Sequence, residues 1–256
     1  MAPGLVDLLF GDVTLLQYLL VAFVAFAASI VGGIAGYGPG LILPIILVPI
    51  IGAEATVPVI GISAFFGNAT RLHVFRAHFD ARRAALVAAC AVPSCIVGAY
   101  GYTLLTGPGA AIVIGAALLV LVPLRRLLER RKFRLSTRGL AVAGFGYGFL
   151  SGGTAGSGLV LLSILLATGL GGPAVIATDA AISLVMATTK AIVFQSAGVL
   201  TPSVWAMVLL IGLSVSPGAF VARWLLHRFS ARIHTALIEG AVVVGGTILV
   251  VRGLFG

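Results

Sequence analysis

Charged residues are scarce in this chain. Only 9% of its 256 residues are Asp, Glu, Lys or Arg, whereas 60% are hydrophobic; a soluble domain carries about 25% charged residues. This scarcity excludes an ordinary soluble domain. It predicts an all-α, polytopic helical membrane protein, because helices satisfy their own backbone groups in lipid. The length fits a single membrane domain, residues 1–256.

Acidic residues are the rarest charged class, with 7 Asp and Glu against 16 Lys and Arg. A net charge of +9 could indicate nucleic-acid binding. However, almost all the basic residues lie in short stretches between apolar runs, which is the distribution of the positive-inside rule. We therefore expect a lipid bilayer as the partner of the basic residues, and no nucleic acid.

Cysteine is limited to Cys90 and Cys95, which lie five positions apart on one predicted helix and so do not share a face. We expect neither a disulfide nor a metal site. The first fifteen residues carry Asp7 and Asp12 but no Lys or Arg, so no cleavable signal peptide is expected. The sequence also lacks an ATP-binding loop and a zinc motif. We therefore expect no cofactor, and gradients of ions or substrate must drive any transport.

Glycine, by contrast, is plentiful, and it is concentrated in two runs. Residues 32–40 contain five glycines and residues 152–158 contain four. Each glycine costs about 1 kcal/mol in a helix interior relative to alanine, so each run should break its helix. Broken backbone survives in a membrane only where protein buries it or where it lines a polar cavity. Two breaks in matching positions of two halves indicate the binding site of a transporter.

The apolar stretches predict helices joined by short links. The helical stretches are about 13–31, 41–51, 55–71, 84–105, 110–124, 139–169, 173–197, 202–226 and a last one that ends near 251. A turn is expected at residues 52–54. The basic links are 71–83, 125–138 and 223–232.

The two halves of the chain are similar. We predict a first repeat at residues 1–127, a basic cytoplasmic link at 128–138 and a second repeat at 139–256. Each repeat has a glycine-broken helix followed by three transmembrane helices. The basic links occupy different positions in the two repeats, so the positive-inside rule predicts that the repeats are inverted.

The second broken run is predicted to be a re-entrant hairpin. The basic links on either side of the second repeat should both be cytoplasmic, and three apolar stretches separate them, so an even number must cross. Each arm of the run at 139–169 has about 12 residues, or about 18 Å, which is too short for a 30 Å hydrocarbon core. The first broken run is interpreted in the same way, although its first arm is longer. The alternative is eight plain crossings, with one basic loop outside.

Three motifs carry a family resemblance: Gly32-Gly33-x-x-Gly36-x-Gly38, Ser151-Gly152-Gly153-x-x-Gly156-x-Gly158 and Pro217-Gly218-Ala219. With them the chain resembles, over nearly its whole length, the TauE/SafE family of sulfite and organosulfur anion exporters. The resemblance implies a multi-pass carrier of the bacterial inner membrane for small sulfur-containing anions such as sulfite or sulfonates. Pro39 and Pro44 depart from the pattern beside the first run.

The two glycine runs are the candidate anion site. Backbone N–H groups at a helix break and the positive end of a helix dipole attract anions, and nearby hydroxyl groups add donors. The candidate substrate-binding residues are Gly33, Gly36, Tyr37, Gly38, Ser151, Gly152, Gly153, Thr154, Gly156, Ser157, Gly158, Arg71 and Lys190. The alternative is that the glycines only allow close helix packing.

Four charged residues lie inside or near the ends of predicted helices. Arg71 and Lys190 occupy equivalent late positions and could provide field or gating at the site, or could instead reach toward an interface. Asp179 lies eleven positions before Lys190, nearly on the same helix face. Asp179 and Glu239 are candidates for proton coupling, because ionisable residues within a membrane are functional candidates. The alternative is that they are structural carboxylates near the cytoplasmic interface.

These observations predict a secondary active anion transporter, with a passive anion channel or an anion exchanger as the alternative. An intramembrane enzyme was also considered, because Ser157 lies between glycines as in rhomboid-type serine proteases. Such an enzyme needs a histidine within the membrane. The histidines all fall at or beside basic links: His73, His78, His227 and His234. We therefore do not expect an enzyme. A homodimer is left open.

Overall fold

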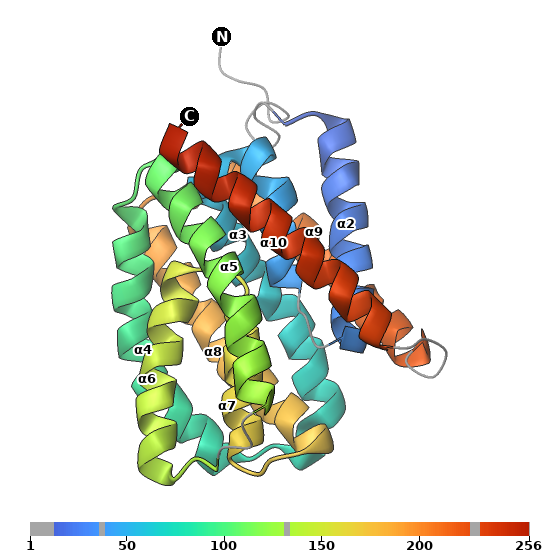
Figure 1. The fold of residues 1–256 in the computed structure, drawn as a ribbon, viewed down its shortest axis with the longest axis vertical. Coiled ribbons are helices and arrows are strands. Elements are labelled where there is room, and N and C mark those ends of the chain that lie inside the picture. Colours follow the sequence, from blue (N-terminus) through green and yellow to red (C-terminus); the bar gives the residue numbers. More distant parts are fainter. Residues whose placement is uncertain (1–12, 36–38, 131–133, 226–230, 256) are drawn as a thin grey trace.

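The computed structural model describes residues 13–35, 39–130, 134–225 and 231–255, which form helices and no strands (Figure 1). The helices are α2 (Leu15–Ala35), η1 (Pro39–Leu41), α3 (Leu43–Phe75), η2 (Arg76–His78), α4 (Ala81–Thr103), α5 (Gly107–Arg130), α6 (Thr137–Gly153), α7 (Gly158–Ala167), α8 (Gly172–Ser196), α9 (Pro202–Leu225) and α10 (Ala231–Phe255).

The helices have the length and surface of membrane spans. Within the part of the chain that the structure describes, four stretches are long and apolar enough to cross a membrane: Leu43–His78, Ala81–Thr103, Gly107–Leu124 and Gly172–Ser196. Large apolar side chains on several helices are more than half exposed, among them Phe23, Val97, Val142 and Leu213. An exposed apolar surface of this kind suits lipid rather than water. The prediction of a polytopic helical membrane protein is confirmed.

The helix α3 reverses its direction at Gly52, whose φ of 82° and ψ of 161° are not helical. Ala53, the next residue of α3, lies beside the end of α4, where the Tyr102 hydroxyl donates a hydrogen bond of 2.5 Å to the Ala53 carbonyl. Seven residues later the chain has returned toward its start, because a Cβ built on Gly40 would lie 3.7 Å from Ile60 Cγ2. The turn predicted at 52–54 is confirmed, and residues 43–51 pair with α2 as the two arms of a hairpin.

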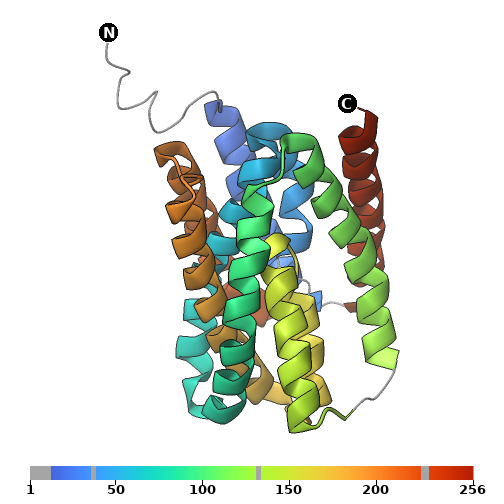
Figure 2. The ribbon, with the colours of Figure 1, turned by 90° about the vertical axis from the view of Figure 1, so that its left-hand side faces the viewer.

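The helices α6 and α7 form a second hairpin, which enters the bundle from the opposite end (Figures 1 and 2). The backbone N–H of Leu135, just before α6, donates a 2.9 Å hydrogen bond to the carbonyl of Ala167, the last residue of α7. Both ends of this run therefore lie at the same end of the bundle, and Thr154–Ser157 form its tip. The hairpin that parity and arm length predicted for this run is confirmed.

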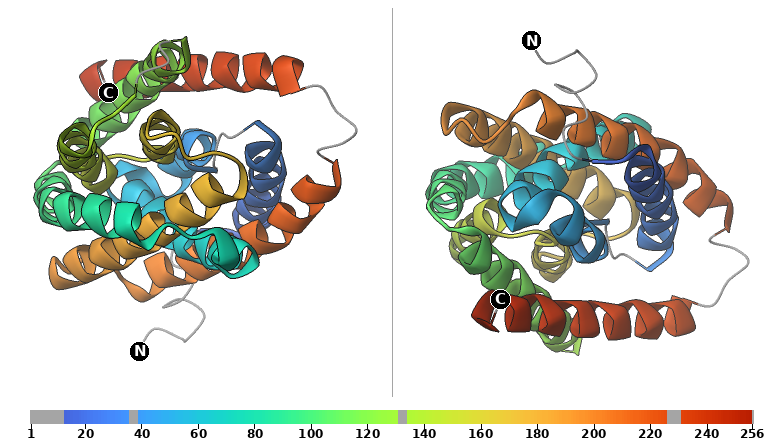
Figure 3. Two further views of the ribbon diagram at one scale, coloured as in Figure 1. Left: turned by 90° about the horizontal axis from the view of Figure 1, so that it is seen from below. Right: turned by 90° about the horizontal axis from the view of Figure 1, so that it is seen from above.

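The helix pairings follow a two-fold pattern. The helix α4 packs against α6 and α8, and correspondingly α9 packs against α2 and α3. The pairs α3–α8 and α5–α10 join equivalent elements. End views show α10 along one side of the bundle, next to α5 (Figure 3). This two-fold pairing is the arrangement that inverted repeats require. The boundaries of the repeats at 127 and 139 stay a prediction, and α5 continues to Arg130, so the predicted link is partly helical.

Glycines allow α4 and α6 to pack backbone against backbone. A Cβ on Gly148 would collide with the carbonyl of Ala91, and one on Gly152 with the carbonyl of Cys95. A Cβ on Gly98, which lies on α4, would in turn collide with the carbonyl of Phe149 on α6. The hairpin tip is therefore held deep in the bundle by a contact that no larger residue permits.

This contact predicts unequal costs for two neighbouring substitutions on α6. Gly148→Ala should destabilise the protein by about 1–3 kcal/mol, the usual cost of overpacking. Gly146→Ala is the matched control, because nothing lies within 4 Å of the added Cβ. Thermal unfolding in detergent checks this, and equal midpoints for the two variants would contradict the packing.

The inverted arrangement predicts which links share a side of the membrane. Single cysteines at positions 131 and 230, in basic links, should react with an impermeant maleimide from one side only. Single cysteines at positions 108 and 200 should react only from the other side, because their links are uncharged. Reaction of positions 131 and 230 from opposite sides would contradict inverted repeats.

Candidate functional site

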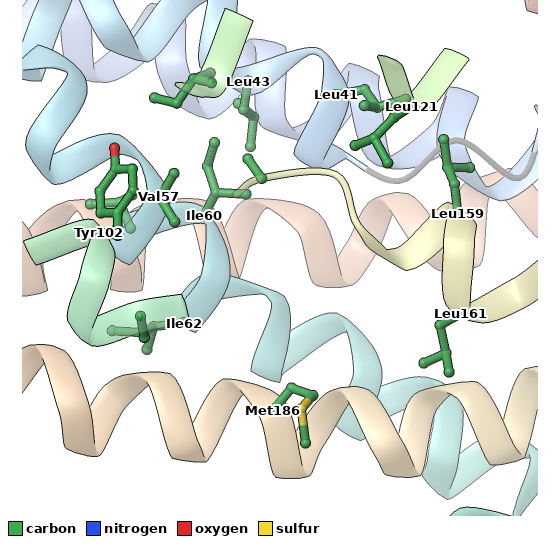
Figure 4. Packing of buried hydrophobic residues seen from close by; sticks show 14 of the residues in the cluster. Leu41, Leu43, Val57, Ile60, Ile62, Tyr102, Leu121, Leu159, Leu161 and Met186 are labelled. Atoms are coloured by element: carbon green, nitrogen blue, oxygen red, sulfur yellow. The ribbon is translucent and has the colours of Figure 1, made fainter. Parts of the chain in front are cut away.

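The two glycine runs meet inside the bundle. A Cβ built on Gly40, at the end of the first run, would lie 3.0 Å from the Gly156 nitrogen and 3.1 Å from its Cα. Gly156 has a φ of 82°, in the left-handed region that favours glycine. Figure 4 shows the segment between α6 and α7 passing Ile60 and Leu41. We call this contact between Gly40 and Gly156 the glycine junction.

The polar residues of the second run are not equivalent. Thr154 ends α6, and its hydroxyl donates a 2.7 Å hydrogen bond to the carbonyl of Leu150, so this donor is already used. Ser157 is buried at the N-terminus of α7, and its hydroxyl caps no backbone group of that helix. Ser151 is buried one turn before Thr154. The N–H groups of Leu159 and Val160 already donate to the carbonyls of Gly156 and Ser157. The Ser157 hydroxyl and the Gly158 N–H are therefore the donors best placed at the junction.

The remaining glycines of this run have different surroundings. Gly152 and Gly153 pack against α4, where a Cβ on Gly153 would lie 3.4 Å from the Gly98 carbonyl oxygen. Gly158 has nothing within 4 Å of an added Cβ. Gly152 thus serves packing, as the alternative interpretation of the glycines predicted, whereas the backbone at Gly158 is open.

Lys190 reaches the region beside the junction from α8. Its side chain is only 7% exposed, and its Nζ lies 2.9 Å from a Cβ built on Gly61 of α3. Ile60, the residue before Gly61, contacts the junction through Gly40. Cys95 of α4 is near enough to interact electrostatically with the Lys190 ammonium. Within the described residues the ammonium has neither a hydrogen bond nor an ion pair.

Arg71 lies at the other end of the α3–α8 contact and has a different environment. It is partly exposed and acts on the charge of Asp179, with which it forms no direct ion pair. Asp179 is 8% exposed, and its Oδ1 has no hydrogen-bond partner among the described residues. The structure therefore separates two residues that the sequence paired: Lys190 lies near the junction, and Arg71 lies near Asp179.

Several predicted site residues cannot be placed in this geometry. Gly33 lies in α2, near its end. Gly36, Tyr37 and Gly38 fall outside the described residues, and so does the side chain of Glu239, whose backbone lies in α10. Their roles in substrate binding or proton coupling stay predictions.

The sequence analysis missed two neighbours of the charged residues. Gly61 was not identified, although a small residue on the facing helix is what makes room for the Lys190 side chain. Tyr147, which is 2% exposed, was missed as well, and its hydroxyl lies close to those of Ser151 and Ser183. The spacing of Tyr147 and Ser151, one helical turn apart, is the signal that could have found this cluster.

A cavity of about 330 Å³ lies at the end of the bundle that holds the Gly52 turn. It is lined by Ile51, Gly52, Ala53, Glu54, Ala55, Tyr102, Thr103, Leu105, Gly107, Phe194 and Val199. Phe194 lies one helical turn beyond Lys190 and packs edge-to-face on Tyr102, with ring centroids 6.3 Å apart. Both rings are buried and line the cavity on the side of α8 that leads to Lys190.

Two broken helical hairpins that enter from opposite ends and meet beside a buried cation define a polytopic helical membrane protein of the transporter type. The family model described as Sulfite exporter TauE/SafE matches residues 21–249, so the chain belongs to this family. The family resemblance stated from the glycine motifs is confirmed. No curated protein and no solved structure matches the chain. The family is one of anion-exporting membrane transporters, which agrees with the expectation that the protein is not an enzyme.

The geometry predicts that Gly61 positions Lys190. In Gly61→Ala the new Cβ would lie 2.9 to 3.1 Å from Nζ, Cε and Cδ of Lys190, so the ammonium must move. We expect about tenfold weaker sulfite binding, or about 1.4 kcal/mol, measured by the thermal shift of the purified protein. Gly101→Ala, with nothing within 4 Å of its Cβ, is the control. Unchanged binding by Gly61→Ala would place the anion away from Lys190.

Proposed function

We propose that the protein is a secondary active transporter that exports small sulfur-containing anions, such as sulfite or organosulfonates, across the bacterial inner membrane. The observation that carries the proposal is the Lys190 ammonium, which is buried without a counter-ion beside the glycine junction. A buried charge is costly unless it is paired. A substrate anion supplies the missing partner. Family membership supports the same chemical class.

The junction complements Lys190 with neutral donors. The ammonium is a compact point charge with three donors, while the Ser157 hydroxyl and the Gly158 N–H offer further donors without a second full charge. Gly156 has no side chain, so an anion can approach the backbone closely. Several converging donors on one side, with a cation on the other, suit a pyramidal or tetrahedral oxyanion.

Access to this site is proposed to alternate between the two ends. The cavity at the Gly52 end stops at the aromatic pair of Phe194 and Tyr102, one turn from Lys190. A buried aromatic pair between cavity and site suits a carrier, in which an end is closed until the pair separates, better than an open channel. Parting of these rings would connect Lys190 to the cavity.

Flux into proteoliposomes tests the proposal. The purified protein should take up radiolabelled sulfite with saturable kinetics, and Lys190→Gln should weaken the apparent affinity roughly 10- to 150-fold, because hydrogen bonds to charged groups contribute about 1.5–3 kcal/mol. Arg252→Gln removes an exposed basic residue in the last turn of α10 and is the matched control.

The outcomes separate the competing functions. Wild-type affinity in Lys190→Gln would refute the assignment of the site. Conduction that does not saturate and follows only the membrane potential would indicate the alternative, a passive anion channel. Uptake that strictly requires an anion on the opposite side would indicate an anion exchanger. A homodimer also stays a prediction, which light scattering of the detergent complex can check.

A further inference from the structure

A line of buried polar groups connects Lys190 with Asp179. The two residues lie on nearly one face of α8, about 16 Å apart along the helix axis, and Ser183 lies one turn from Asp179 on that face. Lys190 and Asp179 are both more than nine-tenths buried, and neither has a hydrogen-bond partner within the described ranges. Two unsatisfied groups of opposite charge inside one apolar bundle call for ligands that satisfy them.

Side chains from α4 and α6 fill the interval between these two groups. The Tyr147 hydroxyl lies close to the hydroxyls of Ser151 and Ser183, and the ring is near enough to Asp179 to be affected by its charge. The buried Cys95 is near enough to Tyr147 and to Lys190 to interact electrostatically with both. The packing of Gly152 on the Cys95 carbonyl brings this part of α6 directly against α4. The line therefore runs along the contact of α6 with α4 and α8.

The other charged groups near Asp179 form no direct ion pair with its carboxylate within the described residues. On α3, Arg71 acts on the Asp179 charge without a direct ion pair, and the segment η2, which packs on α8, brings the exposed Arg76 and His78 to this end. Asp80 accepts the N–H of Arg83 and pairs with its guanidinium. The ten residues of α7 include no ionisable side chain.

These surroundings favour a proton as the ligand of Asp179. A sodium ion needs several oxygen ligands around it and would be repelled by the nearby guanidinium of Arg71, whereas a proton needs only the one free carboxylate oxygen. A protonated carboxyl group gains an O–H donor, for which the Tyr147, Ser151 and Ser183 hydroxyls offer acceptors.

We propose that Asp179 binds one proton in each transport cycle, and that the hydroxyl groups of Tyr147, Ser151 and Ser183 relay this proton along the α6–α8 contact toward the anion site at Lys190. The carboxylate takes the proton from solution and becomes a neutral carboxyl group; on release the proton returns to solution. In the relay each hydroxyl oxygen accepts one proton while its own passes on, so no charge accumulates. The inference rests on the proposed function and specifies its coupling ion.

The coupling follows from charge. An ionised Asp179 lowers the affinity of the region for an anion, and its neutralisation removes that repulsion. Anion binding in turn favours protonation of Asp179 by the same factor, because linkage between two sites is reciprocal. Proton and anion are therefore expected to move together, so a pH gradient that is acidic outside should concentrate sulfite inside proteoliposomes. In a cell, export by this route then requires an outward anion gradient that exceeds the opposing proton gradient.

Two transport assays separate coupling from binding. Potassium and valinomycin clamp the membrane potential in both, one measuring sulfite accumulation driven by a pH gradient and the other sulfite counterflow without a gradient. Wild type should show both. Asp179→Asn should keep counterflow within about twofold but lose the pH-driven accumulation, since a fixed neutral group still allows exchange. Sulfite itself binds protons as the pH changes, but this affects wild type and Asp179→Asn equally, so it does not alter the comparison between them.

Two further variants keep the carboxylate and test the relay. Tyr147→Phe and Ser183→Ala should slow pH-driven accumulation about tenfold and leave counterflow unchanged. Tyr100→Phe, an exposed tyrosine on α4, is the matched control and should behave as wild type. If Asp179→Asn does not fold, the pH-driven accumulation by Tyr147→Phe and Ser183→Ala tests the proposal instead.

The results that overturn the proposal are distinct from those that overturn the function. Accumulation by Asp179→Asn at the wild-type level, or accumulation in wild type that follows a sodium gradient and ignores the pH gradient, would refute the proton site. Wild-type rates of pH-driven accumulation in both Tyr147→Phe and Ser183→Ala would refute the relay. Absence of counterflow in wild type would instead refute the anion transporter itself.

Discussion

The broken backbone at the two glycine runs has to be covered by protein, because lipid cannot accept or donate its hydrogen bonds. The rest of the bundle follows from this constraint. Each hairpin is held by an outer helix, α9 for the first and α4 for the second, and the two tips cover one another at Gly40 and Gly156. The close packing of α6 on α4 depends on glycines as well. Glycine therefore both breaks the helix between α6 and α7 and allows α4 to hold this hairpin.

The two halves share an architecture but not a chemistry. Arg71 of α3 and Lys190 of α8 are equivalent positions, yet Arg71 is near the carboxylate of Asp179, whereas Lys190 faces Gly61 and has no counter-ion. The first repeat has Ile60 where the second has Asp179, counting the same eleven residues back from the basic residue. Within the described residues Lys190 thus has no counter-ion, whereas Arg71 acts on the charge of Asp179 without a direct ion pair.

Much of the fold could be predicted from the sequence, because its signals lie within single segments or follow from counting segments between the basic links. The glycine runs predicted the breaks, Gly52 the turn, and the arm length with the parity of the basic links the α6–α7 hairpin. The site was predicted less completely. Lys190 and Asp179 are visible as charges in apolar runs, but Gly61 and Tyr147 acquire their significance only from the helices that face them, and the relative rotation of helices is set by packing rather than by one segment's pattern.

A shared junction also explains why one site can serve both ends of the protein. The hairpins enter from opposite ends, so a movement of either one opens a path from its own end only. At the contact of Gly40 with Gly156 the two backbones meet directly, and the buried Leu41 side chain packs against Gly156. Lys190 is carried by α8, a helix separate from either tip, and so it stays in place while the tips move. Under the proposed alternating access, the charge on α8 beside the junction would allow the same anion to be exposed in turn to the two sides.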